Sequence, residues 1–258
     1  MTAELKSSSQ GQTLILTLSN PGFHNALEPQ MYAAGVEAFN AAESNPEVRT
    51  IVIVGADGDF SAGGNVHKLQ ARRDQAPDLM AQQLQGLHHW IEAIRTCPKP
   101  VIAAVEGAAA GAGFSLALAC DFIVSARNAK FVMAYSNIAL SPDAGASWHL
   151  SRALPRQTAT ELLMLGGRAS AQRLHELGLI NLLSEPDQAL VQAMALAGQL
   201  NTRAPNALAS IKELLNDAAN ASLAEQLDSE CDHLVKNLHH ANAGRAIDAF
   251  LSKTRPVL

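Results

Sequence analysis

Apolar positions in the first two thirds of the chain alternate between short runs and longer periodic stripes. The segments 13–18, 50–54 and 100–105 are short and aliphatic, which is typical of buried strands. The segments 29–42 and 77–95 repeat apolar residues every three or four positions, which predicts helices with one buried face. This alternation of strands and helices predicts the α/β fold class.

The pattern becomes mainly helical from about residue 143 onward. Four later stretches have helical spacing, at 187–200, 205–217, 223–238 and 244–253. Shorter elements are expected in between, namely a helix at 111–120 and strands at 121–125, 130–133 and 179–183. We therefore expect a core domain over residues 1–190 and a helical C-terminal region over residues 191–258.

Composition and charge narrow the functional classes. Hydrophobic residues make up 48% of the 258 positions and charged residues 17%, which is typical of a well-buried globular protein. The net charge is -5 and no basic cluster stands out, so we expect no nucleic-acid partner. Residues 1–10 are polar and lack the apolar stretch of a secretory signal. The apolar run 100–119 contains Glu106 and several glycines, which predicts a buried strand and helix and no membrane span.

The three cysteines, Cys97, Cys120 and Cys231, are widely spaced and form no C-x-x-C motif. This usage argues against a zinc or disulfide framework, so no metal is expected. It is typical of a reducing compartment, and we expect a cytoplasmic protein.

Two glycine-rich loops, at 59–65 and 106–114, each follow an apolar strand. Glycine lets a backbone approach a ligand closely, and the second loop also opens a helix whose first N–H groups lack internal partners. Two such loops can direct N–H groups at one oxygen that gains negative charge during a reaction. The alternative is that the glycines serve turns and tight packing alone. Neither loop matches a phosphate-binding motif.

These loops belong to a longer series of motifs. In order and spacing, they resemble the crotonase (enoyl-CoA hydratase/isomerase) superfamily over residues 12–185. The motifs are Asn25-Ala26-Leu27 after Asn20-Pro21, Phe60 to Asn65, Lys99 to Gly107, Gly111-Ala112-Gly113, and Leu116 to Asp121. The resemblance implies a crotonase spiral of repeated ββα units with a helical C-terminal trimerisation region.

The resemblance also implies a site. The N–H groups of Gly64 and Ala112 would form an oxyanion hole for an acyl-CoA thioester, which is the substrate, and no separate cofactor is implied. The implied contacts to coenzyme A fall on Asn25, Ala26, Leu27, Ala62 and Gly63.

The C-terminal helix contributes two further implied residues. Phe250 and Lys253 resemble a segment that packs across subunits near the adenine of coenzyme A, in a homotrimer or a dimer of trimers. The alternative is the end of an amphipathic helix with a solvated lysine.

The resemblance fails at the two glutamates that a hydratase of this superfamily uses. Their positions fall on Ser115 and Tyr135. Asp143 is instead similar in place to the aspartate of dienoyl-CoA isomerases and of ring-epoxide isomerases in phenylacetate breakdown. The alternative is that Asp143 caps the next helix. Tyr135 either hydrogen-bonds substrate or Asp143, or is a packing residue.

The leading hypothesis is therefore an acyl-CoA enzyme that stabilises a thioester enolate and isomerises the double bond of an enoyl-CoA. Hydration through Asp143 and Tyr135, or ring opening, is left open. The alternative from another class is a catalytically silent scaffold that binds coenzyme A and has lost both glutamates.

Overall fold

Nine strands form two sheets over residues 2–256, which the computed structural model describes. The main sheet has the strand order β1-β2-β3-β4-β6-β9, in which only β1 is antiparallel to its neighbour. Its strands are β1 (Glu4–Gln10), β2 (Thr13–Ser19), β3 (Thr50–Gly55), β4 (Val101–Val105), β6 (Phe122–Ala126) and β9 (Leu182–Ser184). The second sheet, in the order β5-β7-β8, has strands β5 (Ala108–Ala110), β7 (Lys130–Val132) and β8 (Arg168–Ser170).

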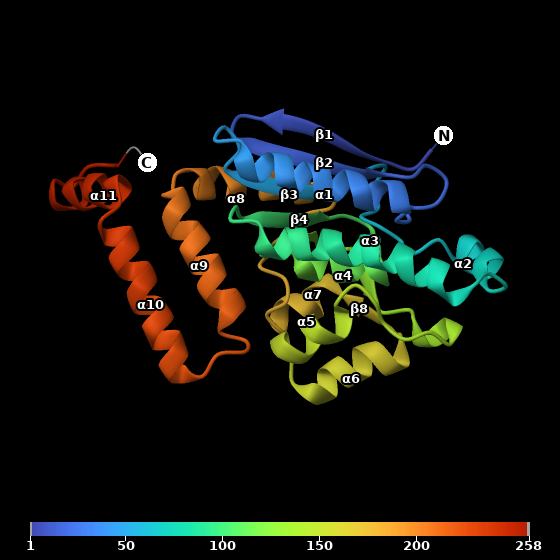
Figure 1. Cartoon of the computed structure of the whole chain (residues 1–258). Helices are drawn as coiled ribbons and strands as arrows, with labels where there is room; N and C mark the ends of the chain where they lie inside the picture. Colours follow the sequence, from blue (N-terminus) through green and yellow to red (C-terminus); the bar gives the residue numbers. More distant parts are fainter. Residues whose placement is uncertain (1, 257–258) are drawn as a thin grey trace.

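Helices cover the main sheet and continue into the C-terminal third (Figure 1). The helices up to β9 are α1 (Pro29–Ser44), α2 (Val66–Arg72), α3 (Pro77–Thr96), α4 (Ala112–Ala119), the 3₁₀ helix η1 (Ser136–Ile138), α5 (Ala146–Ala153), α6 (Arg156–Leu165) and α7 (Ala171–Glu176). The later helices are α8 (Ala189–Asn201), α9 (Pro205–Asp217), α10 (Leu223–Leu238) and α11 (Ala241–Leu251).

The sheet is buried on both faces, as the unbroken apolar runs of β3 and β4 predict. Alternate side chains of these strands, such as Ile53 and Ala103, join the large cluster that includes α1, α3 and α4. The intervening ones, such as Val52 and Ile102, pack against the alanine face of α8 on the other side. Both strands are thereby fixed, and so are the loops that leave their carboxyl ends.

Three strands were not predicted from the sequence. β1 pairs with β2 from Glu4 opposite Ser19 to Gln10 opposite Thr13, but nearly all its side chains are exposed, so it lacks the apolar signal of a strand. β5 and β8 have three residues each, which is too short for a periodic pattern. The helices expected at 205–217 and 223–238 are confirmed with the same bounds.

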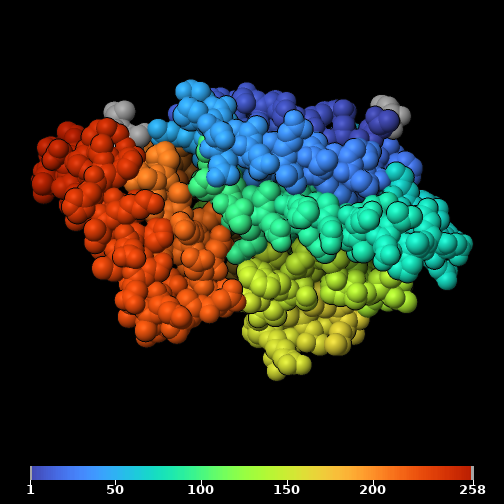
Figure 2. All heavy atoms as spheres, in the orientation of Figure 1, coloured from blue at the N-terminus to red at the C-terminus, as the bar shows by residue number. Residues whose placement is uncertain are grey.

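Helices α9 to α11 project from the core as an arm (Figure 1), and the space-filling view shows a recess between this arm and the α5–α6 region (Figure 2). Because α8 still packs on the sheet, the arm begins after α8. The division of the chain at residue 190 stays a prediction.

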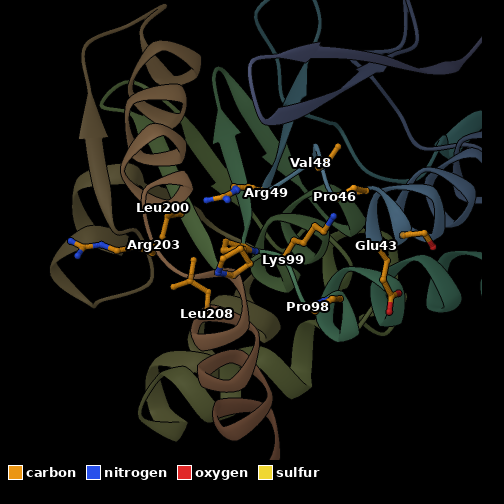
Figure 3. Close-up of a pocket in the computed structure, with 12 residues that line it drawn as sticks. Glu43, Pro46, Val48, Arg49, Pro98, Lys99, Leu200, Arg203 and Leu208 are labelled. Carbon is orange, nitrogen blue, oxygen red and sulfur yellow. The ribbon is translucent and has the colours of Figure 1, made fainter. Parts of the chain in front are cut away.

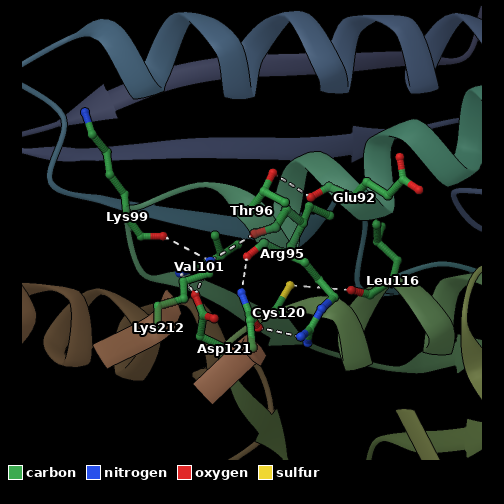
Figure 4. Close-up of polar contacts among 11 residues, drawn as sticks. Glu92, Arg95, Thr96, Lys99, Val101, Leu116, Cys120, Asp121 and Lys212 are labelled. Carbon is green, nitrogen blue, oxygen red and sulfur yellow. Dashed lines mark hydrogen bonds and ion pairs between the residues drawn. The ribbon is translucent and has the colours of Figure 1, made fainter. Parts of the chain in front are cut away.

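A buried lysine docks the arm onto the core (Figure 4). The Lys212 ammonium of α9 donates to the Asp121 carboxylate at 2.7 Å, and to the carbonyl oxygens of Ile94 at 2.9 Å and Lys99 at 3.3 Å. The same carboxylate oxygen accepts the Val101 N–H at 2.8 Å. A buried charge needs this full set of partners, so α9 is fixed where α3 ends and β4 and β6 begin.

The contact between α1 and α3 generates a stability prediction. A Cβ on Gly35 would lie 2.3 Å from Cε2 of the buried Trp90 indole. We expect Gly35→Ala to lower the free energy of unfolding by roughly 1–3 kcal/mol, because the rigid ring cannot move aside. Urea denaturation measures the change.

The matched control is Gly198→Ala on α8, where a Cβ would meet nothing within 4 Å. This variant should unfold at the same or a slightly higher urea concentration, since alanine favours a helix by about 1 kcal/mol over glycine. Equal destabilisation by the two substitutions would contradict the packing explanation.

Candidate active site

The two glycine-rich loops are in direct backbone contact. Ser61 forms a parallel bridge with Ala109, with the Ser61 N–H donating to the Ala108 oxygen and the Ala110 N–H to the Ser61 oxygen, both at 2.9 Å. A Cβ on Gly63, whose φ is +81°, would lie 2.4 Å from the Ala110 oxygen. Only glycine fits there, so this residue allows the loops to meet.

Two unused amides flank this contact. The site of the missing Gly63 Cβ is 3.0 Å from the Ala112 nitrogen, and Gly64 is the next residue along the first loop. Ala112 is the first residue of α4, after the N-cap Gly111, so its N–H has no partner within the helix. Among residues 2–256, neither the Gly64 nor the Ala112 N–H donates a hydrogen bond. The hydrogen-bonding capacity of both amides is therefore unused within this part of the chain.

Each amide direction is set by the carbonyl of the same planar peptide. The Gly63 oxygen accepts the Leu27 N–H at 2.7 Å, so the Gly64 N–H points away from Leu27. The Gly111 oxygen accepts the Ser115 N–H at 3.0 Å and its hydroxyl at 3.2 Å, which orients the Ala112 N–H in the same way. Ser115 is fully buried and acts here as a positioning residue.

The Asn25-Ala26-Leu27 segment lies behind the first loop. The Asn25 side-chain amide donates to the carbonyl oxygens of Ala56 and Asp59, both at 2.7 Å, and the Ser61 hydroxyl donates to the Asn25 oxygen at 2.8 Å. All three residues of the segment are buried. The structure therefore shows them bracing the loop. Their contact with coenzyme A, like that of Ala62 and Gly63, stays a prediction.

Tyr135 and Asp143 form a hydrogen-bonded pair beside the second loop. The Tyr135 hydroxyl donates to Asp143 Oδ1, and a Cβ on Gly111 would lie 3.7 Å from Tyr135 Cζ. The alternative in which Asp143 caps the next helix is wrong, because α5 has Gly145 as its N-cap with no side-chain cap. Tyr135 is half-buried and has a polar role as well as a packing one.

Burial controls the protonation of this pair. It raises the pKa of the Asp143 carboxyl, while the hydrogen bond from Tyr135 and the nearby His88 lower that pKa in part. Burial and the negative charge of Asp143 raise the pKa of Tyr135 far above its usual value, so its phenol stays protonated and donates. A buried carboxylate with a raised pKa can take up a proton more readily than an exposed one and return it during a reaction.

Tyr32 was not identified from the sequence. It lies on the first turns of α1, and its ring packs 3.5 Å from the site of a Gly86 Cβ. Burial raises the pKa of its hydroxyl most, and the negative charges of Asp143 and Glu28 raise that pKa further. A periodic apolar pattern predicts a helix but does not distinguish a side chain that faces a site from one that faces the core. The sequence therefore offered no reason to single out Tyr32.

Four histidines lie on α2, α3 and α5. His88, whose charge lowers the pKa of the Asp143 carboxyl, is exposed, and so are His67 and His89. His149 is buried, and its pKa is lowered to about 4 by burial and then by Arg95 and Arg152. Phe250 is 82% exposed on α11, at the opposite end of the molecule from α2 (Figure 1). Phe250 and the exposed Lys253 do not meet the other candidates within one chain, so their role stays a prediction.

Two surface hollows are also present. One, of about 410 Å³, lies at the opposite edge of the sheet, where β3 and β4 begin (Figure 3), and is lined by Arg49, Lys99 and Leu208 among others. The other, of about 680 Å³, lies between α1 and α3 and includes Tyr32. Over residues 2–256, no cluster of three potential metal-ligating side chains occurs, and no helix has the length and apolarity to cross a membrane.

The chain resembles known proteins over nearly its whole length. A family model described as Enoyl-CoA hydratase/isomerase matches residues 9–258. The 1,2-epoxyphenylacetyl-CoA isomerase of Escherichia coli (strain K12) is 35% identical over 244 residues, covering 94% of this chain and 93% of that protein. The carnitinyl-CoA dehydratase of Salmonella typhi is 34% identical over 262 residues, with coverages of 100% and 98%.

A crystal structure of an enoyl-CoA hydratase from Polaromonas sp. JS666 has a TM-score of 0.97 and 64% identity, covering 98% of each chain. A structure of an enoyl-CoA hydratase from Bacillus anthracis, 24% identical, shares the fold with a TM-score of 0.92. The predicted crotonase fold is thus confirmed, and the chain belongs to the enoyl-CoA hydratase/isomerase family.

Proposed function

We propose that the chain binds an acyl-CoA thioester and stabilises its enolate with the Gly64 and Ala112 N–H groups. Membership of the family and the names of its relatives support the substrate class. Two unpartnered amides beside a glycine contact support the oxyanion hole. Fixed dipoles of this kind stabilise a developing oxyanion without having to reorganise during the reaction.

The proposed reaction is isomerisation of an enoyl-CoA. The Asp143 carboxylate removes a proton from the α-carbon of a 3-enoyl thioester, and the electron pair moves to the thioester oxygen. The protonated carboxyl then returns the proton to the γ-carbon, and the double bond ends between the α- and β-carbons. The Tyr135–Asp143 pair carries this proposal, because it supplies one proton-transfer group with a raised pKa beside the second loop.

Hydration or dehydration is the second candidate. The 34% identity to a carnitinyl-CoA dehydratase favours it. In this reaction the hydrogen-bonded Tyr135 and Asp143 would bind the water and transfer its protons. Ring opening is supported by the 35% identity to an isomerase named for an epoxide substrate. A scaffold that binds coenzyme A without turnover is the remaining alternative.

A homotrimer or a dimer of trimers is proposed for the assembly. The arm presents large apolar side chains to solvent, including Leu215 at 70%, Leu234 at 70% and Phe250 at 82% exposure. Such a surface is typical of a protein–protein contact. Phe250 and Lys253 would then reach the coenzyme A of a neighbouring subunit, and a cytoplasmic location is proposed from the cysteine usage.

The first functional prediction concerns Asp143. We expect Asp143→Asn to lower kcat for isomerisation of 3-enoyl-CoA by about 10²–10⁴-fold, because no other group would move the proton. Conjugated-thioester absorbance follows the reaction, and Asp217→Asn, an exposed aspartate on α9, should keep the parent rate. Thioester binding without turnover on a panel of 2-enoyl, 3-enoyl and epoxide esters would favour the scaffold instead.

The second prediction uses pH. Since Asp143 must be ionised to act as the base, kcat/KM should fall as pH drops through its raised pKa. The hydrogen bond from Tyr135 lowers this pKa, so Tyr135→Phe should move the acid limb of the profile to higher pH. An unchanged acid limb would argue that Asp143 is not the titrating group.

The third prediction isolates one amide. Incorporation of lactic acid in place of Ala112 replaces the N–H with an ester oxygen and leaves the side chain intact. We expect kcat to fall by about 10²–10³-fold, as for loss of one oxyanion donor. The same exchange at Ala224, an exposed alanine on α10, controls for the ester itself and should have little effect on kcat.

A further inference from the structure

A buried carboxylate outside the proposed proton-transfer pair lies behind the first loop. Glu28 has a side chain only 3% exposed and comes directly after Leu27, whose N–H holds the Gly63 carbonyl. It is the N-cap residue of α1, but its side chain makes no capping hydrogen bond there. A buried carboxylate is costly unless it is paired, so its partners indicate what it stabilises.

Both partners belong to the segment that follows Gly64. Glu28 Oε1 accepts the Asn65 side-chain amide at 3.3 Å, and Oε2 accepts the Lys68 ammonium at 2.8 Å. Asn65 in turn caps α2, since its side-chain oxygen accepts the Lys68 N–H at 3.3 Å. One carboxylate therefore ties the start of α1 to the start of α2.

The Gly64 amide lies between two restrained neighbours. The Leu27–Gly64 bridge fixes one side of the peptide, and Asn65 continues the chain on the other. Gly64 itself is exposed, and a Cβ added to it would meet nothing closer than 3.7 Å, so side-chain packing does not fix its orientation. Its orientation is instead restrained by the bridge to Leu27 and by the contact of the Glu28 carboxylate with Asn65.

The charge of Glu28 also needs to be neutralised. A carboxylate close to an amide that stabilises an oxyanion opposes the developing negative charge. The Lys68 ammonium, 2.8 Å from Glu28 Oε2, carries the opposite charge and offsets this effect, and Glu28 Oε1 still accepts the Asn65 amide.

We propose that Glu28, through its paired contacts with Asn65 and Lys68, is a positioning residue for the Gly64 N–H of the oxyanion hole. The proposal rests on the proposed function for its effect on rate. Its structural part, that this carboxylate orders residues 61–66, stands independently of the reaction.

The test exchanges the two partners. In Glu28→Gln the carboxylate is lost, and in Asn65→Asp two carboxylates face each other across a contact of 3.3 Å. The double variant Glu28→Gln/Asn65→Asp restores an amide–carboxylate pair with reversed polarity and the same net charge as the parent. Glu47→Gln, the same chemical change at an exposed glutamate after α1, is the control.

We expect each single variant to lower kcat by about tenfold with KM for the thioester changed less than about threefold, because the lost interaction acts in the transition state. The double variant should recover to within about threefold of the parent. A loss in the double equal to the product of the two single losses would overturn the proposal.

Hydrogen–deuterium exchange of the peptides that span residues 60–68 gives a readout that needs no turnover. Both single variants should exchange faster there, and the double variant should return to parental exchange. Unchanged exchange over residues 60–68 in Glu28→Gln would contradict the positioning role of Glu28, even if the enzyme is active. Altered exchange in a chain that turns over no acyl-CoA would instead count against the proposed function alone.

Discussion

Backbone contact between two loops is the constraint on which the candidate site depends. Ser61 and Ala109 pair as if in a short parallel ladder, and Gly63 lies against the Ala110 carbonyl with no room for a side chain. This close approach places the Ala112 nitrogen beside Gly63, the residue before Gly64. Each amide direction then follows from peptide planarity, because the adjoining carbonyl is already hydrogen-bonded.

The sheet makes that contact rigid. β3 and β4 are buried on both faces, one face by α1 and α3 and the other by α8, so the loops that leave them have fixed starting points. Buried polar side chains then hold the loops, with Asn25 behind the first and Ser115 behind the second. Both side chains are hydrogen-bonded, and a fully hydrogen-bonded buried network makes the surrounding backbone more rigid.

The side chains beside the loops differ from a two-glutamate arrangement. Ser115 hydrogen-bonds the Gly111 carbonyl, and Tyr135 donates to Asp143, whose pKa is raised by burial. A single carboxylate that accepts and returns the same proton suits a shift of a double bond, which needs no second acid or base. For this reason we propose isomerisation in preference to hydration.

The apolar strands 50–54 and 100–105, the helices 205–217 and 223–238, the two glycine loops and the family resemblance could all be predicted from the amino-acid sequence, because each depends on adjacent or periodic residues. The folded chain was needed to show that Asp143 pairs with Tyr135 and caps no helix, and that Glu28 contacts Asn65, the residue after Gly64. It also revealed the polar strand β1, whose pairing and not its composition makes it a strand. These features depend on distances between residues far apart in the chain, and no local pattern records such distances.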